Sequence, residues 1–257
     1  MIGNPQNILI AQLGNLQFWP FTLACAVPAL FGLFSVYLVV WLTWRRHLHI
    51  AQIARPAPPL PALDRWQLGK AVVATGALLV LFTLPLPHAT GVLIVTGAML
   101  VSRKLASRIM LGMVDWHLLV LFASLFIVTA ALSHTGLTAR AIAQLVAAGW
   151  LPDRLAVLAP LALAGSNTIG NVPAVMLLLA VWPDPSAAAL YGLAVFSTLA
   201  GNFLLVGSIA NLIVVERAKD VGVSLGFIDH TRCGVVMTLL AMGFAWCWFW
   251  LTGMMPM

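Results

Sequence analysis

The hydrophobic pattern of this chain consists of long apolar runs rather than short amphipathic periods. About 20 apolar residues in a helix cross the hydrocarbon core of a bilayer. Apolar runs near that length predict transmembrane helices at 18–43, 69–86, 88–102, 116–135, 187–216 and 232–252. A shorter stretch at 138–149, TARAIAQLVAAG, carries Arg140 and predicts a helix that lies at the membrane interface.

One further apolar stretch, 155–182, is interrupted at its middle by GSNTIGN. We interpret it as a re-entrant hairpin of two half-length helices that meet at a polar loop. With the linker 45–68 in the cytoplasm, this hairpin leaves only Arg140 and Arg154, of thirteen Lys and Arg, on the outer side. If 155–182 crossed the membrane completely, the loops after it would change sides and the asymmetry of Lys and Arg would be lost. We therefore expect a multi-pass protein of the bacterial inner membrane with a cytoplasmic linker.

Composition supports the membrane class and excludes others. The chain has 257 residues, of which 62% are hydrophobic and 8% charged, whereas soluble domains carry about 25% charged residues. The net charge of +6 reflects Lys and Arg in cytoplasmic loops, so we expect no nucleic-acid partner. Cys25, Cys233 and Cys247 show no metal-ligand spacing. The predicted fold class is an all-α integral membrane protein with about six transmembrane helices and one re-entrant hairpin.

Three polar, helix-breaking stretches fall where membrane depth is expected: IGNPQN at 2–7, GSNTIGNVP at 165–173 and GNFLLVGSIAN at 201–211. Irregular backbone survives at that depth only inside protein or along a cavity. Discontinuous helices of this kind build the ion and substrate sites of secondary transporters, although a packing kink is the alternative for each break. For 2–7 we expect exposed backbone groups that the rest of this chain does not satisfy.

The first and third breaks share the frame G-x-x-x-N followed by four apolar residues, in IGNPQNILIA and VGSIANLIVV. In the predicted topology the helices that follow them run in opposite directions. Similar motifs in opposite directions indicate an inverted repeat.

DWHLLVLFASLFIVTAALSHTGL, AGSNTIGNVPAVMLLL and AGNFLLVGSIANLIVVERAKDVG, in this order, resemble the second half of the ion transporter superfamily. That superfamily includes arsenite permeases, sodium/proton antiporters, citrate transporters and divalent anion/sodium symporters. MIGNPQNILI resembles the motif that ends the first repeat. The resemblance implies one full inverted-repeat unit and part of the other, in a chain truncated at its N-terminus.

The resemblance also implies two ion or substrate sites. The hairpin tip corresponds to Ser166, Asn167 and Thr168, and the unwound helix facing it to Gly207, Ser208, Ala210 and Asn211. Half of a symmetric first site corresponds to Gly3, Asn4, Pro5 and Asn7. A coupling Na⁺ is expected at Ser166, Asn167, Thr168, Gly207 and Asn211, because hydroxyls, amides and carbonyls suit a hard cation. Asn202 and Thr198 are further candidates, with helix packing as their alternative role.

The expected domain organisation follows the same resemblance. Residues 1–17 are the tail of the first-repeat transport element, and 18–135 are scaffold-like helices. Residues 136–231 form the transport element, with an interfacial helix, the hairpin and the unwound helix, and 232–257 form the last transmembrane helix.

The expected function is secondary active transport of a carboxylate or oxyanion, with Na⁺ as coupling ion, by an elevator-like alternating-access mechanism. No Asp, Glu or Lys lies inside a predicted span, which disfavours a proton relay. The alternatives are an arsenite or cation/proton exchanger of the same superfamily, and a non-transporting remnant or subunit. No catalytic motif indicates an enzyme. Expected partners are a small anion, lipid, and either a second copy or the missing N-terminal half.

Overall fold

The computed structural model describes residues 4–45, 64–84, 88–101, 107–112, 114, 116–150, 152–220 and 222–257. Within these residues the fold is helical without strands. Three helices are long and apolar enough to cross a membrane, namely α2 (Phe18–Trp44), α3 (Arg65–Thr83) and α12 (Phe227–Leu251). The prediction of an all-α membrane protein is confirmed.

The remaining helices are shorter than a full membrane crossing, apart from α6. They are α1 (Pro5–Leu13), α4 (His88–Leu100), α5 (Ser107–Gly112), α6 (Trp116–His134), α7 (Leu137–Ala147), α8 (Leu155–Thr168), α9 (Asn171–Val181), α10 (Ala187–Ala200), the 3₁₀ turn η1 (Leu205–Gly207) and α11 (Ile209–Asp220). The predicted interfacial stretch forms α7, and the predicted span at 187–216 is divided between α10 and α11. Most of the predicted cytoplasmic linker, residues 46–63, lies outside the described residues.

The chain forms two compact units, one of residues 1–49 and 124–257 and the other of residues 50–123. In the second unit α3 packs against α4. Asp64 caps α3, because its Oδ1 accepts hydrogen bonds from the backbone N–H groups of Trp66 and Gln67. Near the same end of this helix pair, Lys70 Nζ donates to the carbonyl of Val101 at 3.2 Å.

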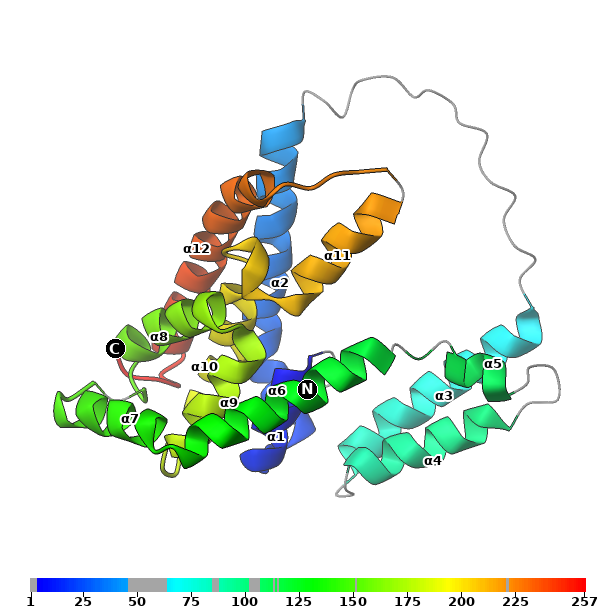
Figure 1. The fold of residues 1–257 in the computed structure, drawn as a ribbon, viewed down its shortest axis with the longest axis horizontal. Coiled ribbons are helices and arrows are strands. Elements are labelled where there is room, and N and C mark those ends of the chain that lie inside the picture. Colours follow the sequence, from blue (N-terminus) through cyan, green and yellow to red (C-terminus); the bar gives the residue numbers. More distant parts are fainter. Residues whose placement is uncertain are drawn as a thin grey trace. The chain divides into compact units, whose positions relative to one another are not determined.

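The first unit is built around α10. Helices α2 and α12 run side by side (Figure 1), and Phe31 stacks on Phe244 with ring centroids 3.9 Å apart. Helix α10 packs against both of them and against α8, and Phe196 and Phe249 are fully buried where α10 meets α12. Helix α2 lies in the same unit as the hairpin and the broken helix, and the division into scaffold-like helices at 18–135 and a transport element at 136–231 stays a prediction.

The stretch 155–182 forms a helical hairpin, as its interrupted pattern predicts. Helices α8 and α9 pack against each other and are joined by Ile169 and Gly170. Gly170 has φ +92°, a backbone conformation that strongly favours glycine. The Ser-Asn-Thr sequence therefore lies in the last turn of α8, directly before the reversal. That both ends of the hairpin return to one side of the membrane stays a prediction.

The third polar stretch also interrupts a helix. Helix α10 ends at Ala200, residues 201–208 turn through η1, and α11 continues from Ile209 (Figure 1). The first polar stretch, 2–7, extends into α1, which starts at Pro5 after Asn4 as N-cap. Proline suits the first turn of a helix, where its missing N–H would have no intrahelical partner.

Candidate functional site

The site is centred on the C-terminal end of α10, whose last carbonyls have no partner within the helix. Side chains from neighbouring helices supply donors. Asn167 on α8 donates through Nδ2 to the carbonyl of Ala200 at 3.0 Å and to that of Leu163, in its own helix, at 2.9 Å. Its Oδ1 accepts from the backbone N–H of Leu204 at 3.0 Å. One amide therefore joins the hairpin to both sides of the break.

Gly207 lies directly against this amide. A Cβ at position 207 would be 2.5 Å from Asn167 Oδ1 and 2.9 Å from the carbonyl oxygen of Gly201. The break can approach Asn167 this closely only because residue 207 has no side chain. Gly201 is packed in a similar way, since its Cβ would be 3.1 Å from Ser208 Cβ and 3.4 Å from Asn171 Nδ2.

Two further side chains bind carbonyls of the break. Asn211 on α11 donates through Nδ2 to the carbonyl of Gly201 at 2.9 Å. His230 on α12 has Nε2 at 3.1 Å from the carbonyl of Asn202. One turn along α12, Gly234 lies against the same carbonyl, and a Cβ there would also be 2.9 Å from the carbonyl of Phe203. The broken backbone is thus bound from α8, α11 and α12.

The other predicted residues of this site differ in their surroundings. Ser166 is fully buried, and its Oγ donates to the carbonyl of Ser197 at 3.4 Å. Thr168 is exposed, and its hydroxyl donates back to the carbonyl of Ala164 at 2.8 Å. Ser208 Oγ accepts from the N–H of Ala210 at 3.3 Å, and Ala210 is exposed. The structure therefore brings Asn167 and Gly207 into contact and places Asn211 on the same break, whereas Thr168 and Ala210 face outward.

The predicted first half-site lies at the start of α1. Gly3 is outside the described residues, and the side chain of Asn4 makes no capping hydrogen bond. Among the described residues, Asn7 Oδ1 and Gln6 Oε1 are buried without a hydrogen-bond partner. Gln6 Nε2 donates to Ser197 Oγ at 3.1 Å and to Thr198 Oγ1 at 2.8 Å.

Four helix ends meet at the site. Helices α8 and α10 end there, and α9 and α11 begin there, at Asn171 and Ile209. C-terminal ends carry partial negative charge and favour cations, while N-terminal ends favour anions. Amide and hydroxyl side chains and the imidazole of His230 line the break, and the amide and hydroxyl oxygens suit a hard cation. The arrangement can therefore hold a cation and an anion close together.

Several residues of this network were missed in the sequence. They are Gln6, Ser197, Thr238, His230 and Gly234. A weak signal existed, because Ser197 and Thr198 are adjacent hydroxyl residues in an apolar helix one turn before the break. Nothing in the sequence spacing indicates that Gln6 lies on this turn, since 191 residues separate it from Ser197.

A helical hairpin whose tip is bound to a broken helix, in an apolar all-α chain, is an arrangement of discontinuous helices that also occurs in secondary transporters. Residues 1–189 match the family model described as citrate transporter. The chain belongs to this family.

Curated relatives agree with this assignment. The chain is 29% identical over 273 residues to a 46 kDa membrane protein of Mycobacterium leprae, and 27% identical over 290 residues to an uncharacterized transporter of Mycobacterium tuberculosis. Each alignment covers 98% of this chain and 63% of the relative. The chain is also 28% identical over 209 residues to the P protein of Sus scrofa, covering 72% of this chain and 25% of that protein. No solved structure matches the chain significantly. The chain thus spans less than two thirds of the length of these relatives.

Proposed function

We propose that this chain takes part in secondary active transport of a carboxylate anion coupled to Na⁺, and is not an enzyme. The observation that carries the proposal is the contact between Asn167 at the hairpin tip and Gly207 in the helix break. Two discontinuous elements joined in this way, with helix ends of both polarities, are the basis of ion and substrate sites in secondary transporters.

The proposed cation is Na⁺, held among Ser166, Asn167, Thr168, Gly207 and Asn211. Asn167 Oδ1 already accepts one hydrogen bond from Leu204, but an amide oxygen has a second lone pair. Asn211 uses its Nδ2 for Gly201, which leaves its amide oxygen as a ligand. The carbonyls at the ends of α8 and α10 add partial negative charge.

The proposed anion is bound by the N-terminal ends of α9 and α11. The exposed hydroxyl of Thr168 lies at the same tip and offers a polar contact for a carboxylate. Because the matching family model is described as citrate transporter, citrate is the first substrate to test. The alternating movement is assigned to the unit of residues 1–49 and 124–257, which carries both the hairpin and the broken helix.

Uptake of radiolabelled citrate into proteoliposomes tests this function. We expect uptake driven by an inward Na⁺ gradient, and its loss in Asn167→Ala and Thr168→Ala. Gln12→Ala, which changes an exposed amide on α1, is the matched control and should transport normally.

Two results would contradict the proposal and favour its alternatives. Exchange driven by a pH gradient without Na⁺ would indicate a cation/proton exchanger, and arsenite flux without citrate flux an arsenite permease. Absence of flux for citrate, succinate, sulfate and arsenite, in a chain that inserts normally, would indicate a non-transporting subunit.

A further inference from the structure

The last turn of α10, residues 197–200, is bound by two other elements, the hairpin and α1. From the hairpin, Ser166 Oγ donates to the carbonyl of Ser197 at 3.4 Å. From α1, Gln6 Nε2 donates to Ser197 Oγ at 3.1 Å and to Thr198 Oγ1 at 2.8 Å. Ser197 therefore connects the start of α1 to the tip of the hairpin through its own hydroxyl and carbonyl.

This connection lies in the interior of the protein. Gln6 and Ser166 are 0% exposed, and Ser197 is 1% exposed. Water cannot replace a lost partner at such positions without rearrangement, so each hydrogen bond constrains its neighbours more strongly than at a surface. A displacement of Gln6 is therefore transmitted to the turn that accepts bonds from Ser166 and Asn167.

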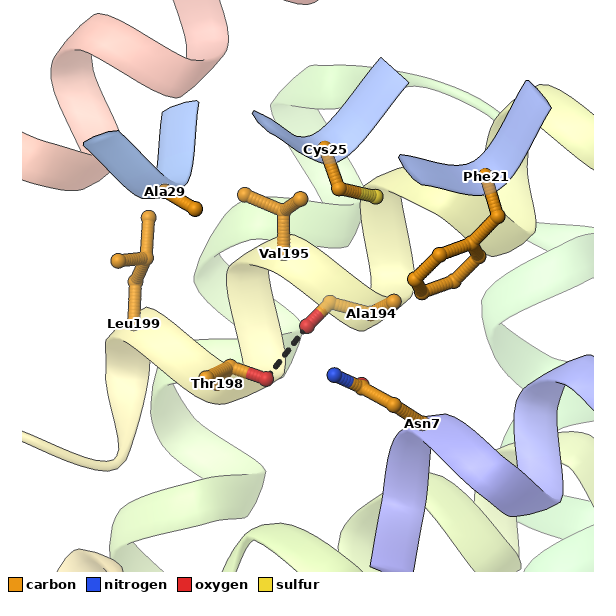
Figure 2. Close-up of a pocket in the computed structure, with 8 residues that line it drawn as sticks. All are labelled: Asn7, Phe21, Cys25, Ala29, Ala194, Val195, Thr198 and Leu199. Atoms are coloured by element: carbon orange, nitrogen blue, oxygen red, sulfur yellow. Dashed lines mark hydrogen bonds between the residues drawn. The ribbon is translucent and has the colours of Figure 1, made fainter. Parts of the chain in front are cut away.

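The packing between α1 and this turn leaves a gap beside Thr198. A cavity of about 90 Å³ lies beside Thr198, among α1, α2 and α10 (Figure 2). The amide of Asn7 points toward the Thr198 hydroxyl across it, while Phe21 and Cys25 of α2 line its apolar side (Figure 2). Because side chains leave this space unfilled, the two hydrogen bonds of Gln6 hold the first turn of α1 in register with α10.

We propose that Gln6 is a positioning residue, which sets the last turn of α10 and through it the place of Ser166 and Asn167 in the ion site. The inference rests on the proposed function of that site. It links the first half-site to the second, so that a change at the start of α1 alters the hairpin tip. Gln6 makes this link through its Nε2, which donates to two hydroxyls of α10.

Hydrogen exchange of the 257-residue chain in lipid nanodiscs tests the role of Gln6. In Na⁺-free buffer we expect Gln6→Leu to raise the rate of amide exchange about tenfold at 164–170 and 198–204. A rise of this size corresponds to the loss of about one buried hydrogen bond. Gln12→Leu makes the same change at an exposed position of α1 and should leave exchange unchanged. Peptides from 64–84, in the other unit, should not respond to either variant.

Thr198→Val tests the same hydrogen bonding from the other partner. It removes the Thr198 hydroxyl that accepts from Gln6 and keeps the shape of the side chain. It should raise exchange in the same segments, and the double variant with Gln6→Leu should add little to Gln6→Leu alone. If Gln6→Leu fails to fold, Thr198→Val decides by the same criterion. Equal exchange at 164–170 in the Gln6 and Gln12 variants, or in Thr198→Val and wild type, would overturn the proposal.

A Na⁺ titration separates this inference from the proposed function. In wild type, Na⁺ should protect 198–204, and Gln6→Leu should raise the half-protecting concentration about tenfold. If wild type shows no protection by Na⁺, the cation site of the proposed function fails, while the Na⁺-free comparison still decides the role of Gln6.

Discussion

At the scale of single residues, the broken helix is held by polar side chains that bind its carbonyls and by glycines that allow close packing. Asn167, Asn211 and His230 each bind a carbonyl that a continuous helix would have satisfied internally. Gly207 and Gly234 let this backbone approach α8 and α12. In a membrane interior an unsatisfied backbone group costs several kcal/mol, so these contacts make the break tolerable.

Gly207→Ala should destabilise the protein by about 1–3 kcal/mol, because its Cβ would overlap Asn167 Oδ1 and force the break away from the hairpin. Gly243→Ala is the matched control in α12, since a Cβ there meets no atom within 4 Å. Thermal unfolding in detergent, with and without Na⁺, measures both variants. Equal stability of the two variants would mean that the backbone around residue 207 can shift to accommodate a Cβ at no energetic cost.

At the scale of elements, the hairpin and the broken helix pack along α8 and α10, and the site lies where the ends of these helices meet. Helices α8 and α9 have 14 and 11 residues, each too short for a full crossing of about 20. Helix α11 has no buried residues within the described chain, and its contacts are made chiefly through η1. The hairpin and the broken helix are therefore built from half-length helices, while α12, which also binds the break, has 25 residues.

The membrane topology of the hairpin can be tested by cysteine labelling in a background without Cys25, Cys233 and Cys247. Asp153→Cys and Asp184→Cys flank the hairpin, and we expect both to react with an impermeant reagent from outside. A cysteine in the linker 50–65 should react only from the cytoplasm. Labelling of positions 153 and 184 from opposite sides would show that the stretch crosses the membrane.

At the scale of the whole molecule, ion binding should raise the free energy of unfolding. A ligand that binds only the folded state at 100 times its Kd adds about 2.7 kcal/mol to the free energy of unfolding. The two helix breaks and the hairpin all lie in the unit of residues 1–49 and 124–257, so this unit should respond to the ion as one body.

We expect saturating Na⁺ to raise the melting temperature by about 5–10 °C relative to choline at equal ionic strength. Asn167→Ala should abolish the increase, because it removes a proposed ligand and the bond between hairpin and break. Differential scanning fluorimetry measures the shift. Equal melting temperatures in choline and in Na⁺ would argue against a sodium site.

The sequence by itself determined the class of the protein and the positions of its breaks. Apolar runs near membrane thickness predicted the all-α membrane fold, and Gly and Asn within such runs marked 155–182 and 201–211 as discontinuous, because both signals are local in the chain. Only the tertiary structure decided what binds each break. The pairings of Asn167 with Leu204, His230 with Asn202 and Gln6 with Ser197 join residues 37, 28 and 191 positions apart. They depend on how α1, α8 and α12 pack around the end of α10, and hydrophobic periodicity does not encode that packing.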